Sequence, residues 1–250
     1  MYTEEKLKEL QALSLEDKIA LSKLRITEFY EHYDGNVVVS FSGGKDSTVL
    51  LHLVRSVYPH VGGVYCDTGL EYPEVKEHVK KQDNIEIIRP KLSFREVIDQ
   101  YGWVFPSKET AEKIYYAKMG RPWAVNHMNG LNSDGSTSKF KVVYKKWKFL
   151  VDSPFKIHNK CCDIMKKKPF HDYIKSHKCG IYVGILASES QLRKQAWTRT
   201  GCMFCPIGVH LEKHPNRFQR MKVTHPKIYD YCINQLGLGE LLDYVGVDYK

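Results

Sequence analysis

The stretch Val37–Ser47, VVVSFSGGKDS, joins an apolar run directly to a glycine-rich polar run. The apolar part, Val37–Phe41, is typical of a strand that is buried on both faces of a parallel sheet. Two adjacent glycines let a backbone approach an anion closely, and the N–H groups of a following helix attract one. The stretch therefore predicts a strand, an anion-binding loop and a helix, in this order.

The loop fails the two most familiar nucleotide-binding patterns. A Walker-type loop needs a glycine five positions before its Gly-Lys pair and a Ser or Thr after the lysine, but Val39 and Asp46 occupy these positions. The G-x-G-x-x-G spacing of dinucleotide-binding loops is absent as well. Asp46 is unfavourable beside bare phosphates and fits a site in which Mg²⁺ lies between them. A plain strand-to-helix turn with a capping serine is the alternative.

The composition limits which class of protein the chain can be. The chain has 250 residues, of which 42% are hydrophobic and 27% charged, so it can bury the core of one large domain or of a domain with a subdomain. No apolar stretch is long enough to span a bilayer, and the charged N-terminal pattern excludes a secretory signal peptide. A cytoplasmic location without a membrane partner is expected. The net charge of +9 favours anionic partners such as nucleotides, sulfated compounds or nucleic acid, with a merely soluble basic surface as the alternative.

Strands alternate with helices along the chain. Buried-strand patterns occupy 37–41, 61–66, 85–88 and 181–186, and helical patterns occupy 4–33, 48–57, 72–81, 93–101 and 188–197. This order predicts an α/β fold with a doubly wound, mostly parallel sheet. We expect N-terminal helices over 1–35, a nucleotide-binding domain over 36–210 and a helical C-terminal subdomain over 211–250.

The pattern loosens between Gly120 and Pro154. Within this region, Lys139–Val151 is basic and aromatic, which is compatible with a surface that faces nucleic acid, since aromatic rings stack on bases and lysines hold phosphates. The simpler interpretation is an amphipathic strand or helix that caps the sheet. Both stay open.

Ser42–Ser47 resembles the SGGxDS loop of the ATP pyrophosphatase (PP-loop) superfamily. Within that superfamily the chain is similar to the phosphoadenylyl-sulfate (PAPS) reductase family in the broad sense. That family includes sulfonucleotide reductases, the small subunit of ATP sulfurylase and the sulfur-transfer enzymes of DNA phosphorothioation. The resemblance covers roughly residues 36–206 and implies an adenine nucleotide alpha hydrolase-like fold.

Two further stretches carry this resemblance. Val64–Glu74 contains a strand that ends in Asp-Thr-Gly, and Gly184–Arg193 resembles the G-x-R-x-x-E-S-x-x-R element that lies against the nucleotide. Leu186 stands where many relatives carry an arginine, which weakens the case for a standard sulfonucleotide. A capping role for Asp67 and a surface ion pair of Glu189 with Arg193 are the structural alternatives. The resemblance implies these nucleotide-binding residues: Ser40, Ser42, Gly43, Gly44, Lys45, Ser47, Asp67, Thr68, Gly184, Glu189 and Arg193. Among the site residues, Lys45, Asp46 and Arg193 are expected to be catalytic, with Asp46 as a Mg²⁺ ligand and Asp67 as its helper.

Four of the seven cysteines fall in two tight pairs, Cys161-Cys162 and Cys202-x-x-Cys205. They resemble the ligands of the [4Fe–4S] cluster in the family's iron–sulfur members, and WTRTGCMFC resembles a stretch of the phosphorothioation enzymes. Four thiolates suit iron–sulfur or zinc, but structural zinc sites usually use spaced pairs, so the cluster is preferred. Zinc and four free cysteines stay open. Lys166–Lys168 are either a solvated helix face or hold an anionic group of the substrate near the cluster, and Cys66, Cys179 and Cys232 are expected to be structural.

The resemblance leaves two reactions and one non-enzymatic role. Sulfonucleotide reductases attack the substrate sulfur with a cysteine in a C-terminal tail, whereas this chain ends in GVDYK and its loop is intact. We therefore expect cleavage of ATP to AMP and pyrophosphate, adenylation of an acceptor oxygen and sulfur transfer. The basic surface makes nucleic acid a candidate acceptor, and a sulfur-donor protein and a homodimer stay open. The alternatives are a sulfonucleotide reductase with a thiol supplied in trans, and a non-enzymatic zinc-containing module that binds nucleotides or nucleic acid.

Overall fold

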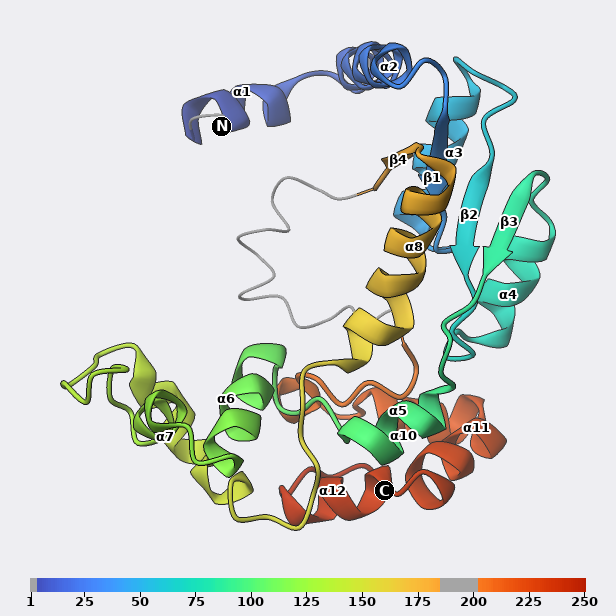
Figure 1. Cartoon of the computed structure of the whole chain (residues 1–250). Helices are drawn as coiled ribbons and strands as arrows, with labels where there is room; N and C mark the ends of the chain where they lie inside the picture. Colours follow the sequence, from blue (N-terminus) through green and yellow to red (C-terminus); the bar gives the residue numbers. More distant parts are fainter. Residues whose placement is uncertain (1–3, 185–201) are drawn as a thin grey trace. The chain divides into compact units, whose positions relative to one another are not determined.

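The computed structural model describes residues 4–184 and 202–250 (Figure 1). The chain divides into two compact units that alternate along the sequence. Unit 1 contains Met1–Asp67, Tyr72–Arg89 and Lys168–Glu189, and unit 2 contains Thr68–Glu71, Pro90–Lys167 and Ser190–Lys250. The predicted domain boundaries at residues 35 and 210 stay predictions.

Unit 1 is built around a parallel sheet of four strands in the order β3–β2–β1–β4. All three pairings are parallel, and Val39 of β1 lies opposite both Gly63 of β2 and Tyr182 of β4. The strands are β1 (Val37–Ser40), β2 (Gly63–Cys66), β3 (Ile85–Ile88) and β4 (Gly180–Tyr182). This arrangement confirms the predicted α/β fold with a parallel sheet.

Helices cover both faces of this sheet because successive strand residues point to opposite sides. Val37 and Val39 of β1 pack with residues of α2, α3 and α4, whereas Val38 packs on the opposite face near Phe170 and Tyr173 of α8. Figure 1 shows α3 and α8 on opposite sides of the strands. The helices of unit 1 are α1 (Glu4–Ala12), α2 (Leu15–His32), α3 (Lys45–Arg55), α4 (Pro73–Lys80) and α8 (Lys168–His177). The sheet is therefore doubly wound.

The strand order reverses direction at β1. From β1 the chain moves outward through β2 to β3, and it later returns to the other side of β1 as β4. In open parallel sheets, ligands bind beyond the carboxyl ends of the strands at such a switch point. The loop after β1 therefore lies where a ligand is expected.

Unit 2 is helical in the part of the chain that the structure describes. Helices α6 and α7 pack on each other and on the 3₁₀ helix η1, and α10, α11, η4 and α12 pack in sequence order. The bounds are α5 (Phe94–Tyr101), α6 (Lys108–Lys118), α7 (Pro122–Met128), η1 (Lys141–Leu150), the π-helical η2 (Asp163–Lys167), η3 (Val209–Leu211), α10 (Arg217–Thr224), α11 (Pro226–Asp230), the π-helical η4 (Tyr231–Gln235) and α12 (Leu238–Tyr244).

Most predicted elements lie within a few residues of their expected positions. The 4–33 region forms two helices, and β3 has the predicted bounds of 85–88. The loose region 120–154 contains α7 and η1, and η1 is a helix that packs on α6 and α7. The predictions for 185–186 and 188–197 lie outside the described residues. In the described ranges, no helix is both long enough and apolar enough to traverse a bilayer.

Gly102 is predicted to be the least replaceable glycine of unit 2. It ends α5 with a positive φ of 79°, and a Cβ added there would overlap the carbonyl oxygen of Lys156, which accepts the N–H of Trp103 at 3.0 Å. Gly102→Ala should therefore lower the free energy of unfolding by at least about 3 kcal/mol, from backbone strain and overpacking together. Chemical denaturation measures this loss.

Gly120→Ala is the matched control. Gly120 also has a positive φ, of 71°, but a Cβ there meets no atom within 4 Å. Its replacement should cost only the strain of the left-handed conformation, about 1–2 kcal/mol. Equal losses in the two variants would show that the contact with Lys156 is not the cause.

We predict that His210 makes the free energy of unfolding of unit 2 sensitive to acid. Its ring contacts the rings of Phe105 and Trp147, with centroid distances of 5.6 and 4.9 Å, and its Nδ1 has no hydrogen-bond partner among the described residues. Burial, and secondarily the charge of Lys146, lowers the pKa of His210 from 6.5 to about 4. The unfolded chain therefore binds more protons than the folded chain between these two pH values, and the free energy of unfolding falls as the pH drops through this window.

The test compares the wild type with His210→Phe by urea denaturation at neutral pH and at a pH between the two pKa values. The wild type should lose about 1–2 kcal/mol more than the variant on acidification, after allowance for solvent screening of a partly exposed ring. His127 and His158, whose pKa values burial also lowers, titrate in both proteins, so the difference isolates His210. Identical losses in the two proteins would refute this assignment.

Candidate functional site

The turn after β1 depends on Gly43. Gly43 has a φ of 71°, a region that side chains disfavour, and a Cβ there would lie 2.8 Å from a methyl group of Val75 and 2.9 Å from one of Val79. Both valines belong to α4, so a glycine is needed for conformation and for space. The turn passes into α3, whose N-terminus at Gly44 has no side-chain cap. Uncapped helix N-termini are favourable places for anions.

Two serines hold this turn together. The hydroxyls of Ser42 and Ser47 lie 3.1 Å apart, and the Ser47 hydroxyl accepts the N–H of Ser42 at 3.2 Å and donates to the carbonyl of Gly44 at 2.9 Å. Ser47 is buried, with 6% of its surface exposed. The hydrogen bonds of Ser47 therefore lie within the loop, whereas Ser42 and Gly44 are exposed to solvent.

Lys45 and Asp46 open α3 side by side. The Nζ of Lys45 lies 2.7 Å from Oδ1 of Asp46, and the two side chains are 68% and 31% exposed. Gly184, two residues beyond the end of β4, lies against this point, since a Cβ on it would be 3.3 Å from the carbonyl oxygen of Asp46. The structure thus brings Gly184 to the loop from a position far along the sequence.

Asp67 lies at the same edge of the sheet, one residue after β2. It interacts with two cations, Lys76 of α4 at 3.0 Å and Arg89 directly after β3 at 3.5 Å. Neither cation is among the sequence-predicted site residues. The available signal was the position of Arg89, since the residue after a strand in a parallel sheet lies at the ligand-binding edge. The carboxyl edge of unit 1 therefore carries Lys45, Lys76 and Arg89 near two carboxylates.

Thr68 belongs to unit 2, unlike its neighbour Asp67. The Thr68 hydroxyl donates to Oε1 of Glu71 at 2.7 Å, and the N–H groups of Thr68 and Leu70 both donate to Oε2 of Glu71 at 3.2 Å. Thr68 and Glu71 are buried. The hydroxyl of Thr68, predicted as a nucleotide contact, is thus bonded to Glu71.

The four paired cysteines all lie in unit 2. Cys161 and Cys162 directly precede η2, and Cys202 and Cys205 lie in a turn in which the N–H of Cys205 donates to the carbonyl of Cys202 at 3.3 Å. Burial raises the pKa of Cys161, Cys202 and Cys205, the last to about 12. Charges on the other three thiols raise the pKa of Cys161 further, so the four thiols share one region.

This region has further charged residues. Lys166 lies 3.9 Å from Oε1 of Glu71. Burial opposes the charge of Lys166, but Cys202 and Glu71 outweigh it and raise the pKa of the lysine. Arg217 donates to the carbonyl of Cys205 at 2.9 Å and to Glu212 at 2.8 Å, which fixes the turn that carries Cys205.

The residue types of this region favour a bound metal or cluster, but the arrangement of its described side chains is not that of a metal site. Four partly exposed thiols in one region fit a group that binds thiolates, such as an iron–sulfur cluster or zinc. Within 4–184 and 202–250, however, no three His, Cys, Asp or Glu side chains stand in an arrangement ready to hold a metal ion. The remaining cysteines Cys66, Cys179 and Cys232 are buried.

The predicted nucleotide site is therefore partly assembled in unit 1. Ser40, which ends β1, the loop Ser42–Ser47, Asp67 and Gly184 all belong to this unit and follow its strands. Glu189 and Arg193 lie outside the described residues. The structure also adds Lys76 and Arg89, which the sequence patterns did not reveal.

The same part of the chain matches a known domain. Residues 36–122 match the phosphoadenosine phosphosulfate reductase domain. The chain is 28% identical to an adenosine 5′-phosphosulfate reductase of Staphylococcus haemolyticus over 72% of this chain and 74% of the relative. It is 27% identical to an adenosine 5′-phosphosulfate reductase of Bacillus cereus over 75% of this chain and 90% of that enzyme.

An archaeal protein aligns over more of the chain. An uncharacterized protein of Methanocaldococcus jannaschii is 24% identical over 92% of this chain. The chain spans 58% of the length of that protein and 43% of a second uncharacterized protein from the same organism. The domain match and the reductase relatives agree with the parallel sheet and its glycine-rich loop, and they support a relationship of the chain to the PAPS reductase-like family.

Proposed function

We propose that the chain binds ATP at the carboxyl edge of unit 1 and cleaves it between the α- and β-phosphates, activating an acceptor oxygen for sulfur transfer. The observation that carries this proposal is the intact loop at the switch point of the sheet. Gly43 and Gly44 give it a turn without side chains, α3 begins directly behind it, and Lys45 stands at its exposed end. Pyrophosphate is the ligand that such a turn suits best.

The proposed reaction has two steps. The acceptor oxygen attacks the α-phosphorus of ATP, the bond to the bridging oxygen breaks, and pyrophosphate leaves with its electron pair. A sulfide-level nucleophile from a donor then attacks the acceptor atom that bears the adenylated oxygen, the bond between that atom and the oxygen breaks, and AMP leaves with the oxygen and the electron pair. In the first step Lys45 neutralises the charge that develops on pyrophosphate, which is the main contribution a protein makes to such transfers. Arg193 is proposed to assist it.

Asp46 is proposed to hold Mg²⁺, which neutralises phosphate charge when bound. Its carboxylate is 31% exposed beside the loop and forms an ion pair with Lys45. Oxygen ligands are those that Mg²⁺ prefers, and Asp67 supplies a second carboxylate at the same edge. Lys76 and Arg89 hold that second carboxylate, so its position is fixed before any ligand binds.

Cys161, Cys162, Cys202 and Cys205 are proposed to hold a [4Fe–4S] cluster. The support is the donor set: four partly exposed thiols in one region of unit 2, with Lys166 beside Cys202 to offset thiolate charge. When bound, such a cluster would carry or position the transferred sulfur. Arg217 and Glu212 keep the Cys205 turn in place for it. Zinc, bound by the same thiols in a non-enzymatic module, is the alternative occupant.

A second candidate function is reduction of a sulfonucleotide. It is favoured by the relatives that are named adenosine 5′-phosphosulfate reductase. For this candidate we propose a thiol supplied by another molecule, and the burial of Cys232, whose side chain is 0% exposed, supports this choice. This candidate shares the nucleotide site but needs no cleavage of ATP.

One experiment separates the two candidates. The protein is purified anaerobically, analysed for iron, sulfide and zinc, and incubated separately with ATP and with adenosine 5′-phosphosulfate plus a dithiol. We expect pyrophosphate and AMP from ATP, with turnover increased by a suitable acceptor. Sulfite from the sulfonucleotide without any pyrophosphate from ATP would favour the reductase instead.

A further inference from the structure

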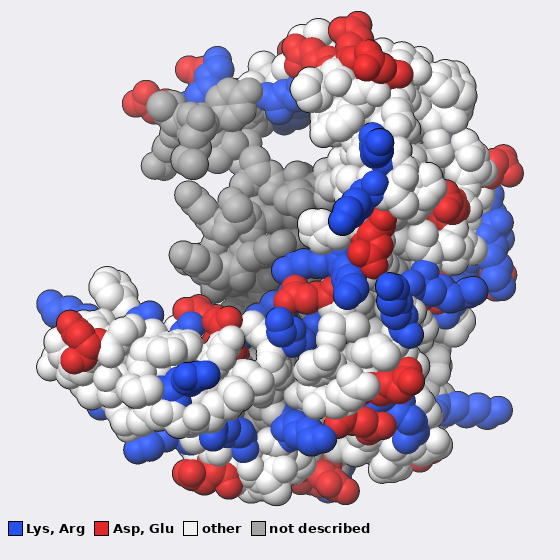
Figure 2. All heavy atoms as spheres, viewed as in Figure 1, with Lys and Arg blue, Asp and Glu red and all other residues white. Residues whose placement is uncertain are grey.

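Most of the net positive charge of the chain is concentrated in one part of unit 2. Residues 108–160 contain eleven Lys and Arg against four Asp and Glu, a net charge of +7 out of the +9 of the whole chain. This segment includes α6, α7 and η1, which pack on one another. Figure 2 shows basic side chains spread over the surface of this part of unit 2. A charge of this density within 53 residues favours a polyanionic partner.

The helix η1 gives these charges a regular order. It is a ten-residue 3₁₀ helix, in which residues three apart lie in one row. One row, Tyr144, Trp147 and Leu150, is buried. The other two rows are exposed and mix apolar with basic residues: Val142, Lys145 and Lys148 in one, and Val143, Lys146 and Phe149 in the other. Three residues of such a helix rise by about 6 Å, a step comparable to that between phosphates along a nucleic-acid strand.

The lysines within 139–151 form no ion pair with an acidic residue among the described residues. Five lysines and no Asp or Glu fall within residues 139–151, and none of the five forms an ion pair with any described carboxylate. Two of them lie over aromatic rings of η1 itself, Lys141 over Tyr144 and Lys146 over Trp147. Lys139, Lys145 and Lys148 are exposed and can bind an external anion.

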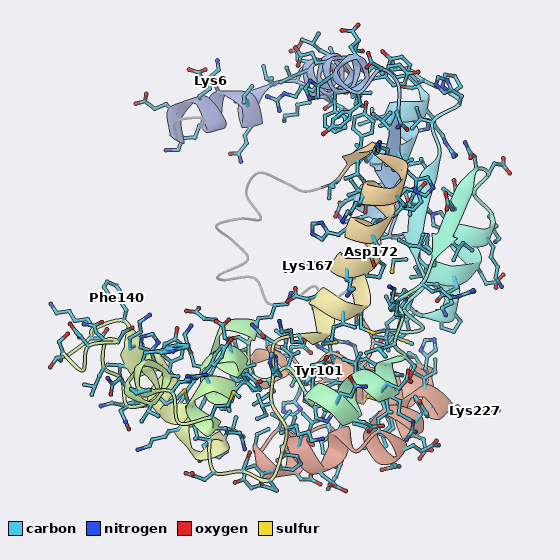
Figure 3. All side chains as sticks on the ribbon, viewed as in Figure 1. Lys6, Tyr101, Phe140, Lys167, Asp172 and Lys227 are labelled. Carbon is cyan, nitrogen blue, oxygen red and sulfur yellow. The ribbon has the colours of Figure 1, made fainter. Side chains whose placement is uncertain are left out.

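Phe140, directly before η1, is the most exposed large apolar residue of the described chain. Its side chain is 87% exposed, and Val142 and Val143 beside it are 52% and 56% exposed. Figure 3 shows the Phe140 side chain at the margin of this part of unit 2, turned away from the ribbon. Proteins that bind single-stranded nucleic acid stack exposed aromatic side chains on its bases and place lysines beside its phosphates.

Two other anionic partners, a membrane surface and an acidic peptide, fit the exposed side of η1 less well. A membrane-surface helix needs a continuous apolar face, but the apolar face of η1 is buried against α6 and α7, and its exposed rows alternate with lysines. An acidic peptide would use the lysines and leave Phe140 without a planar partner. A single nucleic-acid strand uses both, with phosphates on the lysines and a base on the ring.

We infer that the η1 face, made of Lys139, Phe140, Val142, Val143, Lys145 and Lys148, binds single-stranded nucleic acid, with Phe140 stacked on a base. This inference deepens the proposed function and rests on it for the role of the strand as acceptor. The binding itself depends only on the charges and the ring of unit 2.

The test measures binding of the whole chain, without ATP, to a fluorescent oligo-dT longer than about 16 nucleotides, by anisotropy over a range of salt concentrations. The triple variant Lys139→Gln, Lys145→Gln, Lys148→Gln should reduce the slope of log affinity against log salt by about 2, since each phosphate contact on a single strand contributes about 0.7. The matched control Lys18→Gln, Lys175→Gln, Lys227→Gln removes the same charge from exposed sites elsewhere and should leave the slope unchanged. Equal changes in both triple variants would overturn the inference.

Phe140 is tested separately. Phe140→Ala should weaken binding between about 5-fold and 100-fold without changing the salt slope, and Phe140→Trp should restore it, because the loss is one of stacking. Unchanged affinity in Phe140→Ala would overturn the assigned role of the ring. Poly-glutamate or anionic vesicles that displace the oligonucleotide as well as unlabelled oligo-dT does would overturn the choice of nucleic acid.

Failure of the inference is distinguishable from failure of the proposed function. Oligonucleotide binding that depends on the η1 face, in a protein that releases no pyrophosphate from ATP, would support the inference and contradict the proposed reaction. Pyrophosphate release with no oligonucleotide binding would do the reverse.

Discussion

Lys45→Ala is expected to lower the rate of pyrophosphate release from ATP by about 10²- to 10³-fold, the usual cost of removing one group that stabilises developing charge. Lys45 is the first residue of α3 and its side chain is 68% exposed, so its loss should leave the core of unit 1 intact. Steady-state pyrophosphate assays give the rate, and thermal denaturation checks the fold.

Lys175→Ala is the matched control for Lys45→Ala. Lys175 is an exposed lysine on α8 in the same unit, so its removal changes the net charge equally but takes no cation from the loop. Its rate should stay within about twofold of the wild type, as is usual for surface substitutions away from a site. A rate for Lys45→Ala as high as that of this control would contradict the assignment of the loop.

The proposed cluster predicts that Cys202→Ser and Cys205→Ser each lose most of the iron and inorganic sulfide found in the wild type after anaerobic purification. A serine hydroxyl is a much poorer ligand for iron than a thiolate, and clusters of this kind are held by four cysteines. Metal analysis and the loss of brown colour report the effect independently of activity.

Cys179→Ala is the control for the two serine variants. Cys179 is buried in unit 1 beside β4, away from the paired cysteines in sequence, and is expected to serve only packing. This variant should keep its iron and lose a little stability. Zinc in place of iron in the wild type, lost from the serine variants, would contradict the cluster and support the zinc-binding alternative.

The sheet of unit 1 could be predicted from the sequence because its strands are short apolar runs buried on two faces. Val37–Phe41 and Ile85–Ile88 show this pattern clearly. The helix α8 was not among the predicted helices, since a proline such as Pro169 disfavours a helix interior; here Pro169 lies two residues beyond the end of the π-helical η2, where the regular α-helical hydrogen bonding is interrupted. The segment that forms η1 was left open between an amphipathic strand and a helix for a different reason. Its buried residues Tyr144 and Trp147 repeat every three positions, which matches neither an α-helix nor a strand.

The site could be predicted only where its residues are contiguous. The loop after β1 is one stretch of sequence, so its glycines and Lys45 were identified directly. The ion pairs of Asp67 with Lys76 and Arg89 join residues from different elements. Such contacts depend on how strands align in the sheet, which periodicity does not determine. The shared region of the four cysteines, by contrast, was expected from resemblance to iron–sulfur proteins rather than from spacing.

The position of the cleaved bond in ATP tests the central claim most directly. Two analogues are compared with ATP, one with a methylene group between the α- and β-phosphorus and one with it between the β- and γ-phosphorus. We expect AMP from ATP and from the β,γ-methylene analogue, and no product from the α,β-methylene analogue, which should inhibit. Release of ADP from ATP, or loss of turnover with the β,γ-methylene analogue at saturation, would contradict cleavage between the α- and β-phosphates.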